Sequence, residues 1–137
     1  MTDFAKDVSN MHAKFGVRAW MEQNKNDPVL MRKYMRFRLG MCMEEMNETI
    51  TAALFDQDNA EVVDGLIDLC VFAIGTLDVF GVDVNEAWDE VHKANMAKEP
   101  GIKPERENKF GLPDLCKPKG WEQPNHEFNT GNISDAL

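Results

Sequence analysis

Two acidic clusters on strongly apolar segments constrain this chain more than any other feature of its sequence. They are Met41–Glu48, which reads Met-Cys-Met-Glu-Glu-Met-Asn-Glu, and Glu61–Asp68, which reads Glu-Val-Val-Asp-Gly-Leu-Ile-Asp. On a helix, Glu45 and Glu48 lie on the same side as an apolar stripe made of Leu30, Tyr34, Phe37 and Met41. Burying ionised carboxylates side by side costs on the order of several kcal/mol per charge unless a positive charge compensates it. A helical fold with these acids facing inward therefore favours a bound divalent cation.

Apolar residues that recur every three or four positions predict an all-α fold, a four-helix bundle with helices at about 2–25, 28–56, 58–80 and 83–97. Asp27 followed by Pro28 is typical of the start of a helix, and Asp58 can cap the next one. Gly81 is a stop signal for that helix, and Gly16 is a position where the first helix can bend.

The predicted helix over 28–56 is apolar on two opposite faces. Its second face carries Met35, Leu39, Met43, Met46, Ile50 and Ala53. A helix that is apolar on both sides must be covered on both. We therefore expect either a central position in the bundle or an interface between subunits.

The character of the chain changes after Lys98. Prolines and glycines interrupt any periodicity and predict an irregular arm over 99–137, frayed from about Phe128. The arm is basic, with Lys103, Arg106, Lys109, Lys117 and Lys119. It either packs on the helical domain, residues 1–98, or on a neighbouring subunit, where it can close over an anionic ligand, or it is a loose solvated tail.

Composition excludes several classes of protein. The 137 residues suit one domain, and the net charge of −9 argues against binding to nucleic acid or to a membrane surface. No apolar run approaches the roughly 20 residues that span a bilayer, so we expect a cytoplasmic protein. The 3 cysteines lack C-x-x-C spacing, which disfavours zinc.

Acidic residues three positions apart lie on adjacent turns of one helix face. Glu45 with Glu48, and Glu61 with Asp64, form such pairs on consecutive helices, and their oxygen ligands suit magnesium or manganese. Two simpler readings stay open: a solvated helix face, and a capping box between Asp58 and Glu61. A ferritin-like di-iron bundle requires Glu-x-x-His motifs, which are absent.

The E-E-x-x-E of Glu44, Glu45 and Glu48, followed by the E-x-x-D of Glu61 and Asp64, resembles the signature of the all-α NTP pyrophosphatases. This superfamily includes MazG, the dimeric dUTPases, dCTP pyrophosphatases and phosphoribosyl-ATP pyrophosphohydrolase. Asp64–Asp68, Gly75-Thr76, Phe80–Asp83 and Val91–Lys98 resemble its compact, often phage-encoded MazG-like branch, whose members would act in the host cytoplasm. The resemblance covers about Phe15 to Lys98 and extends into the arm at Lys117–Pro124, which reads Lys-Pro-Lys-Gly-Trp-Glu-Gln-Pro.

The resemblance implies hydrolysis of a nucleoside triphosphate between its α and β phosphates. It implies that Glu45, Glu48, Glu61 and Asp64 bind magnesium, with manganese as the possible substitute. Glu44 would orient or deprotonate the attacking water, or help to hold an additional ion.

The resemblance also implies contacts with the substrate. Lys98 would meet phosphate oxygens and Asn95 the sugar or base, although a helix C-terminus also favours a lysine or a capping asparagine by itself. Asp68 replaces an aromatic residue that dCTP-specific relatives carry near the base. Trp20 and Trp121 offer rings for stacking on a base, and we favour a place in the core for each.

Members of this superfamily form dimers or dimers of dimers, so we expect a homodimer or a tetramer. An alternative that uses the same pyrophosphohydrolase reaction is a house-cleaning dUTPase or dCTPase of this superfamily. From another class, the alternative is a non-catalytic helical assembly that binds a structural cation and recruits a protein partner.

Overall fold

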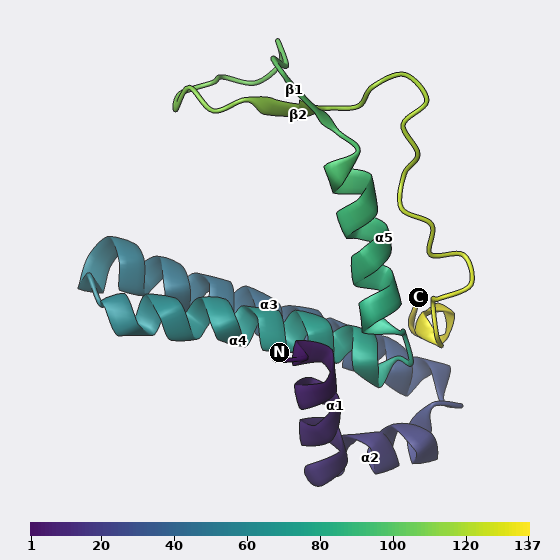
Figure 1. The fold of residues 1–137 in the computed structure, drawn as a ribbon. Helices are drawn as coiled ribbons and strands as arrows, with labels where there is room; N and C mark the ends of the chain where they lie inside the picture. The colour runs from purple at the N-terminus through teal and green to yellow at the C-terminus, as the bar shows by residue number, and fades with distance from the viewer. The chain divides into compact units, whose positions relative to one another are not determined.

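The computed structural model describes residues 1–137, the whole chain (Figure 1). Its helices are α1 (Phe4–Lys14), α2 (Val17–Asn24), α3 (Pro28–Thr51), α4 (Asn59–Val79) and α5 (Val84–Met96). A π-helical turn η1 (Ala52–Asp56) and a 3-10 helix η2 (Ile133–Ala136) accompany two short strands, β1 (Glu99–Gly101) and β2 (Asp114–Cys116). The predicted all-α class is confirmed, with five helices where the sequence suggested four.

The chain groups into two compact units, Met1–Val84 with Asn129–Leu137, and Asn85–Phe128. We call them unit 1 and unit 2. The division that the sequence predicts, a helical domain over residues 1–98 and an arm over 99–137, stays a prediction.

The first predicted helix, 2–25, is divided into α1 and α2. Gly16 separates them in the left-handed region, with φ of 80°. This conformation costs a glycine little, whereas a residue with a Cβ atom would be strained there. The glycine therefore acts as a helix break rather than as a bend.

The α3 and α4 helices form the antiparallel hairpin of unit 1 and lie side by side along their length (Figure 1). Both predicted N-caps are confirmed: the Asp27 carboxylate accepts the Leu30 N–H at 3.0 Å, and the Asp58 carboxylate accepts the Glu61 N–H at 3.1 Å. Gln57, with φ of 54°, completes the reversal between the helices.

The closest approach of α3 to α4 lies at Gly65. A Cβ atom at this position would overlap the Thr49 hydroxyl and would lie 3.2 Å from Thr49 Cβ. The Thr49 hydroxyl donates to the Glu45 carbonyl at 2.7 Å and is buried. Gly65 therefore sets the spacing of the hairpin next to the acidic residues.

We expect Gly65→Ala to lower the free energy of unfolding by roughly 1–3 kcal/mol, because the added methyl group overpacks this contact. In a Thr49→Ala background the cost should largely disappear, since the hydroxyl group is gone. Urea unfolding of the two single variants and the double variant measures this coupling. Gly40→Ala, where nothing lies within 4 Å of the added Cβ atom, is the matched control and should be neutral or stabilising. Additive effects of Gly65→Ala and Thr49→Ala would contradict the assigned contact.

The core of unit 1 gathers residues from both ends of the chain. Met31 and Phe80 are fully buried, and Ala136 of η2 packs with them. Trp20 is partly buried against this core, its ring 4.6 Å from that of Tyr34, so the expected core position is confirmed.

The chain end is ordered by this packing, and the expectation of fraying from Phe128 is wrong. The Asn132 N–H donates to the Phe80 carbonyl at 2.8 Å. The Asn129 side chain accepts the Asp83 N–H at 2.7 Å and donates to the Asp83 carbonyl at 2.8 Å. The segment is too short to show a helical period in sequence, so its stability comes from these contacts.

Charged groups also join the helices of unit 1. The buried His12 of α1 contacts the Asp78 carboxylate of α4 at 2.7 Å, and Arg18 of α2 donates to the same carboxylate at 2.9 Å. Arg38 of α3 is buried and donates to the Thr76 hydroxyl at 3.1 Å. This network fixes α1, α2 and α3 against the C-terminal half of α4.

The predicted second apolar face of α3 remains largely uncovered in the single chain. Leu39, Met43, Met46 and Ile50 of this face are exposed. The hairpin also exposes Leu54 of η1 and Val63, Leu66 and Ile67 of α4. An apolar surface of this extent is typical of a protein interface.

Unit 2 contains most of α5 and a region that the sequence indicated to be irregular. Here β1 and β2 pair antiparallel, with Glu99 opposite Cys116 and Gly101 opposite Asp114. Strands of three residues are too short to produce an alternating pattern in sequence. All three cysteines of the chain are free thiols.

No single helix has both the length and the apolar composition of a membrane span, although α4 and α5 taken together reach both measures.

Candidate functional site

The acidic residues lie along the α3–α4 hairpin of unit 1. In α3, Glu45 comes one turn before Thr49, and in α4, Asp68 comes about one turn after Gly65. Because the helices are antiparallel and touch at Thr49 and Gly65, these two carboxylates lie on the same stretch of the hairpin. The tertiary structure therefore groups Asp68, which the sequence suggested as a base-contacting residue, with the acids of α3.

The electrostatics of Glu45 reflect this grouping. Its pKa is raised above the ordinary value of 4.5, first by desolvation and then by the negative charges of Asp68, Glu48 and Glu44. Like charges raise a carboxyl pKa because each disfavours ionisation of the others. A divalent cation would remove this repulsion, and carboxylate oxygens are ligands that magnesium and manganese prefer.

The structure does not complete the predicted cage. No three acidic, histidine or cysteine side chains converge as metal ligands. Glu61 and Asp64 are exposed and do not contribute to the pKa shift of Glu45. The set of Glu45, Glu48, Glu61 and Asp64 therefore stays a prediction. Its supporting observations are the oxygen-only donors and the repulsion of Glu45 by Glu48.

The expectation that these acids face a packed neighbour is wrong for the single chain. Glu45 is half-buried, whereas Glu44, Glu48 and Asp68 are exposed. Their apolar neighbours on the hairpin are exposed too, so nothing within unit 1 covers that surface.

The capping-box reading of Glu61 has little support. Asp58 does cap α4, but its own N–H donates to the Ala52 carbonyl at 3.0 Å. The reciprocal bond from the Glu61 side chain is therefore not needed to satisfy this donor. Its carboxylate remains exposed on the first turn of α4.

Asn95 and Lys98, the expected substrate contacts, lie together in unit 2. The Lys98 ammonium group donates to the Asn95 side-chain oxygen at 2.9 Å. It also lies 5.7 Å from the centre of the Trp121 ring. The Trp121 indole donates to the Ala94 carbonyl of α5 at 2.7 Å. The ring is half-buried against α5, and the contact with Lys98 is one that sequence reasoning missed.

The model of the family described as phosphoribosyl-ATP pyrophosphohydrolase matches residues 8–95 of this chain. The chain belongs to this family. No curated protein and no solved structure matches it.

Membership of the phosphoribosyl-ATP pyrophosphohydrolase family supports a nucleotide pyrophosphohydrolase type of activity. The matched region contains every acidic candidate, from Glu44 to Asp68, and ends at Asn95. Lys98 and the arm that follows lie outside the match, so their roles depend on the structure of this chain.

Proposed function

We propose that this protein hydrolyses nucleoside or deoxynucleoside triphosphates to the nucleoside monophosphate and pyrophosphate, with magnesium as its cofactor. The observation that carries the proposal is the family match over residues 8–95, which contains the acidic residues of the α3–α4 hairpin. Desolvation, followed by the charges of Asp68, Glu48 and Glu44, raises the pKa of Glu45 within this cluster. Such a cluster of negative charge is unfavourable for the fold alone and suits binding of a cation that also binds phosphate.

The acidic residues divide into two roles in this proposal. Glu45, Glu48, Glu61 and Asp64 hold the cation, magnesium or alternatively manganese. When bound, the cation neutralises the triphosphate and stabilises the departing pyrophosphate. Glu44 orients a water molecule towards the α-phosphorus and accepts its proton. A bond forms between the water oxygen and the α-phosphorus, the bridging bond to the β-phosphate breaks, and pyrophosphate leaves with the electron pair.

The remaining residues bind the substrate. The Lys98 ammonium group, which already donates to Asn95 at 2.9 Å, meets phosphate oxygens. Asn95 hydrogen-bonds the sugar or the base, and Asp68 contributes near the base. An ionised carboxylate at Asp68 only accepts hydrogen bonds, so it would favour a base that presents an N–H group to it.

We propose a homodimer or a dimer of dimers as the working state. The exposed apolar surface of the α3–α4 hairpin supports this, because covering it removes a large hydrophobic area from water. The exposed Met43 and Met46 flank Glu44 and Glu45 in α3, so a second subunit on this surface would lie next to the acidic residues.

A panel of substrates tests the proposed function. The purified protein is incubated with magnesium and each canonical ribo- and deoxyribonucleoside triphosphate, together with phosphoribosyl-ATP, for which the family is named. Monophosphate and pyrophosphate are quantified. Strong preference for dUTP or dCTP would identify a house-cleaning enzyme. Absence of product from every substrate at high enzyme concentration would overturn the proposal and favour a non-catalytic helical assembly.

A further inference from the structure

Lys98 has a lysine neighbour that the sequence does not reveal. The two-stranded sheet of unit 2 pairs Glu99 with Cys116, at the start of β1 and the end of β2. Continuing this register by one residue places Lys98 opposite Lys117. Residues in opposite positions of an antiparallel pair have neighbouring side chains, and like charges in such positions destabilise the pairing.

Both lysine side chains reach the ring of Trp121. The Lys117 ammonium group lies 4.6 Å from the centre of the Trp121 ring, and the Lys98 ammonium group lies 5.7 Å from the same centre. An indole ring attracts cations through its quadrupole, so Trp121 offsets part of the repulsion between the lysines. One ring therefore contacts two ammonium groups, one from each chain segment at the same end of the β1–β2 pair.

Neither lysine has a carboxylate partner. The ion pairs of the protein join other residues, and neither Lys98 nor Lys117 is among them. This is notable in a chain with 24 acidic and 15 basic residues. Two ammonium groups therefore contact one ring without a carboxylate partner in a strongly acidic protein, and an anion is the charge that would complement them.

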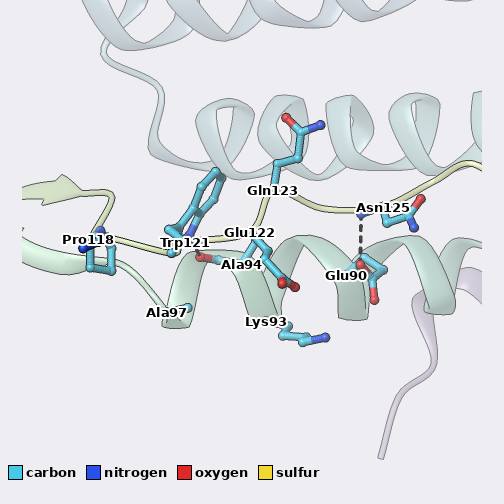
Figure 2. A pocket seen from close by; sticks show the side chains of 11 residues that line it. Glu90, Lys93, Ala94, Ala97, Pro118, Trp121, Glu122, Gln123 and Asn125 are labelled. Atoms are coloured by element: carbon cyan, nitrogen blue, oxygen red, sulfur yellow. Dashed lines mark hydrogen bonds between the residues drawn. The ribbon is translucent and has the colours of Figure 1, made fainter.

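The arm that carries Lys117 and Trp121 is fixed on α5 rather than loose. The Trp121 indole donates to the Ala94 carbonyl at 2.7 Å, and the Asn125 N–H donates to the Glu90 carboxylate at 3.0 Å (Figure 2). A turn closed by the Trp121 N–H and the Pro118 carbonyl, at 3.0 Å, sets the ring against the helix. These hydrogen bonds hold the segment that carries Lys117 and Trp121 against α5.

We propose that Lys98 and Lys117, held over Trp121, jointly bind the phosphate groups of the nucleotide. Lys117 is then a substrate-binding residue supplied by the arm, beyond the residues 8–95 that the family model matches. Trp121 is a positioning residue that acts through the two lysines. The inference rests on the proposed function for its substrate, while the anion site itself rests on the geometry of unit 2.

Steady-state kinetics with the best substrate of the panel provide the first test. Lys117→Gln should raise KM about tenfold and leave kcat almost unchanged, since a charged hydrogen bond to phosphate is lost while the acidic residues are untouched. Lys117→Arg should restore most of the affinity. Lys119→Gln, a nearby exposed lysine of the same turn with no contact to the ring, is the charge-matched control and should keep the KM of the unmodified protein.

A second measurement does not require activity. The protein is labelled with 5-fluorotryptophan, and Trp121→Phe assigns the Trp121 signal in the fluorine NMR spectrum. Inorganic pyrophosphate, added with EDTA at constant ionic strength, should shift this signal as the ammonium groups turn from the ring to the anion. The shift should be lost in Lys117→Gln and kept in Lys119→Gln.

The two proposals fail in different ways. If nucleotides are hydrolysed but Lys117→Gln has the same KM as Lys119→Gln, the inference about the lysine pair is overturned and the proposed function stands. If no nucleotide is hydrolysed, the proposed function fails and the pyrophosphate titration decides the inference alone. A Trp121 signal that pyrophosphate does not move would then overturn it.

Discussion

Replacing Glu48 by glutamine is expected to lower kcat/KM by at least about 100-fold. Substitution of groups that only support a metal ligand typically costs 10–100-fold, and a direct ligand should cost more. The change removes one negative charge and keeps the size of the side chain. The same variant should be equally or more stable without metal, because the charge of Glu48 contributes to the unfavourable field at Glu45.

Two measurements on Glu48→Gln separate catalysis from folding. Initial rates at saturating magnesium give the loss of activity, and thermal unfolding in EDTA gives the stability of the metal-free protein. Glu22→Gln is the matched control, because Glu22 is an exposed acid of α2 that pairs only with Lys25. Its activity should equal that of the unmodified protein. Full activity of Glu48→Gln would show that the assignment of ligands is wrong.

Gly131→Ala is expected to be the most destabilising single methyl addition in unit 1, at roughly 3 kcal/mol. A Cβ atom at this position would overlap the Phe80 carbonyl oxygen and would lie 2.7 Å from the Gly81 carbonyl carbon. Both are backbone atoms, which cannot rotate away as a side chain can. The alanine would push the segment after Asn129 off Phe80 and break the 2.8 Å bond from Asn132.

Urea unfolding of Gly131→Ala measures this cost, and Gly111→Ala supplies the control. Gly111 also has a positive φ, of 68°, but nothing lies within 4 Å of its added Cβ atom. It therefore reports the cost of the backbone conformation alone, on the order of 1 kcal/mol. Equal losses at the two glycines would mean that the contact between Gly131 and Phe80 contributes nothing.

The helices of the hairpin could be predicted from the sequence because their determinants are local. The caps at Asp27 and Asp58, the proline after Asp27 and the apolar period act within a few residues. The break at Gly16 was harder to predict, since the apolar pattern continues on both sides of it. Whether a glycine bends or ends a helix depends on its φ, which the packing of α1 and α2 selects.

The candidate site was predicted as a set of residues rather than as a geometry. The spacing of Glu45 and Glu48 predicts a shared face of one helix, but it contains no information on the residue that faces them. The contact between Thr49 and Gly65 sets the register of α3 against α4, and this register brings Asp68 into the field of Glu45. Asp68 is therefore both a candidate substrate contact and an electrostatic neighbour of Glu45, a candidate metal ligand.

The sequence by itself determined the all-α class, the long hairpin and the identity of the acidic residues, because helix formation and capping are local. Only the tertiary structure decided which of those residues face one another. It also decided that the chain end packs on Phe80 and that Lys98 and Lys117 both contact the ring of Trp121. These contacts join segments far apart in the chain. Packing, backbone pairing and charge stabilise them, and the local sequence pattern around each residue does not predict such long-range interactions.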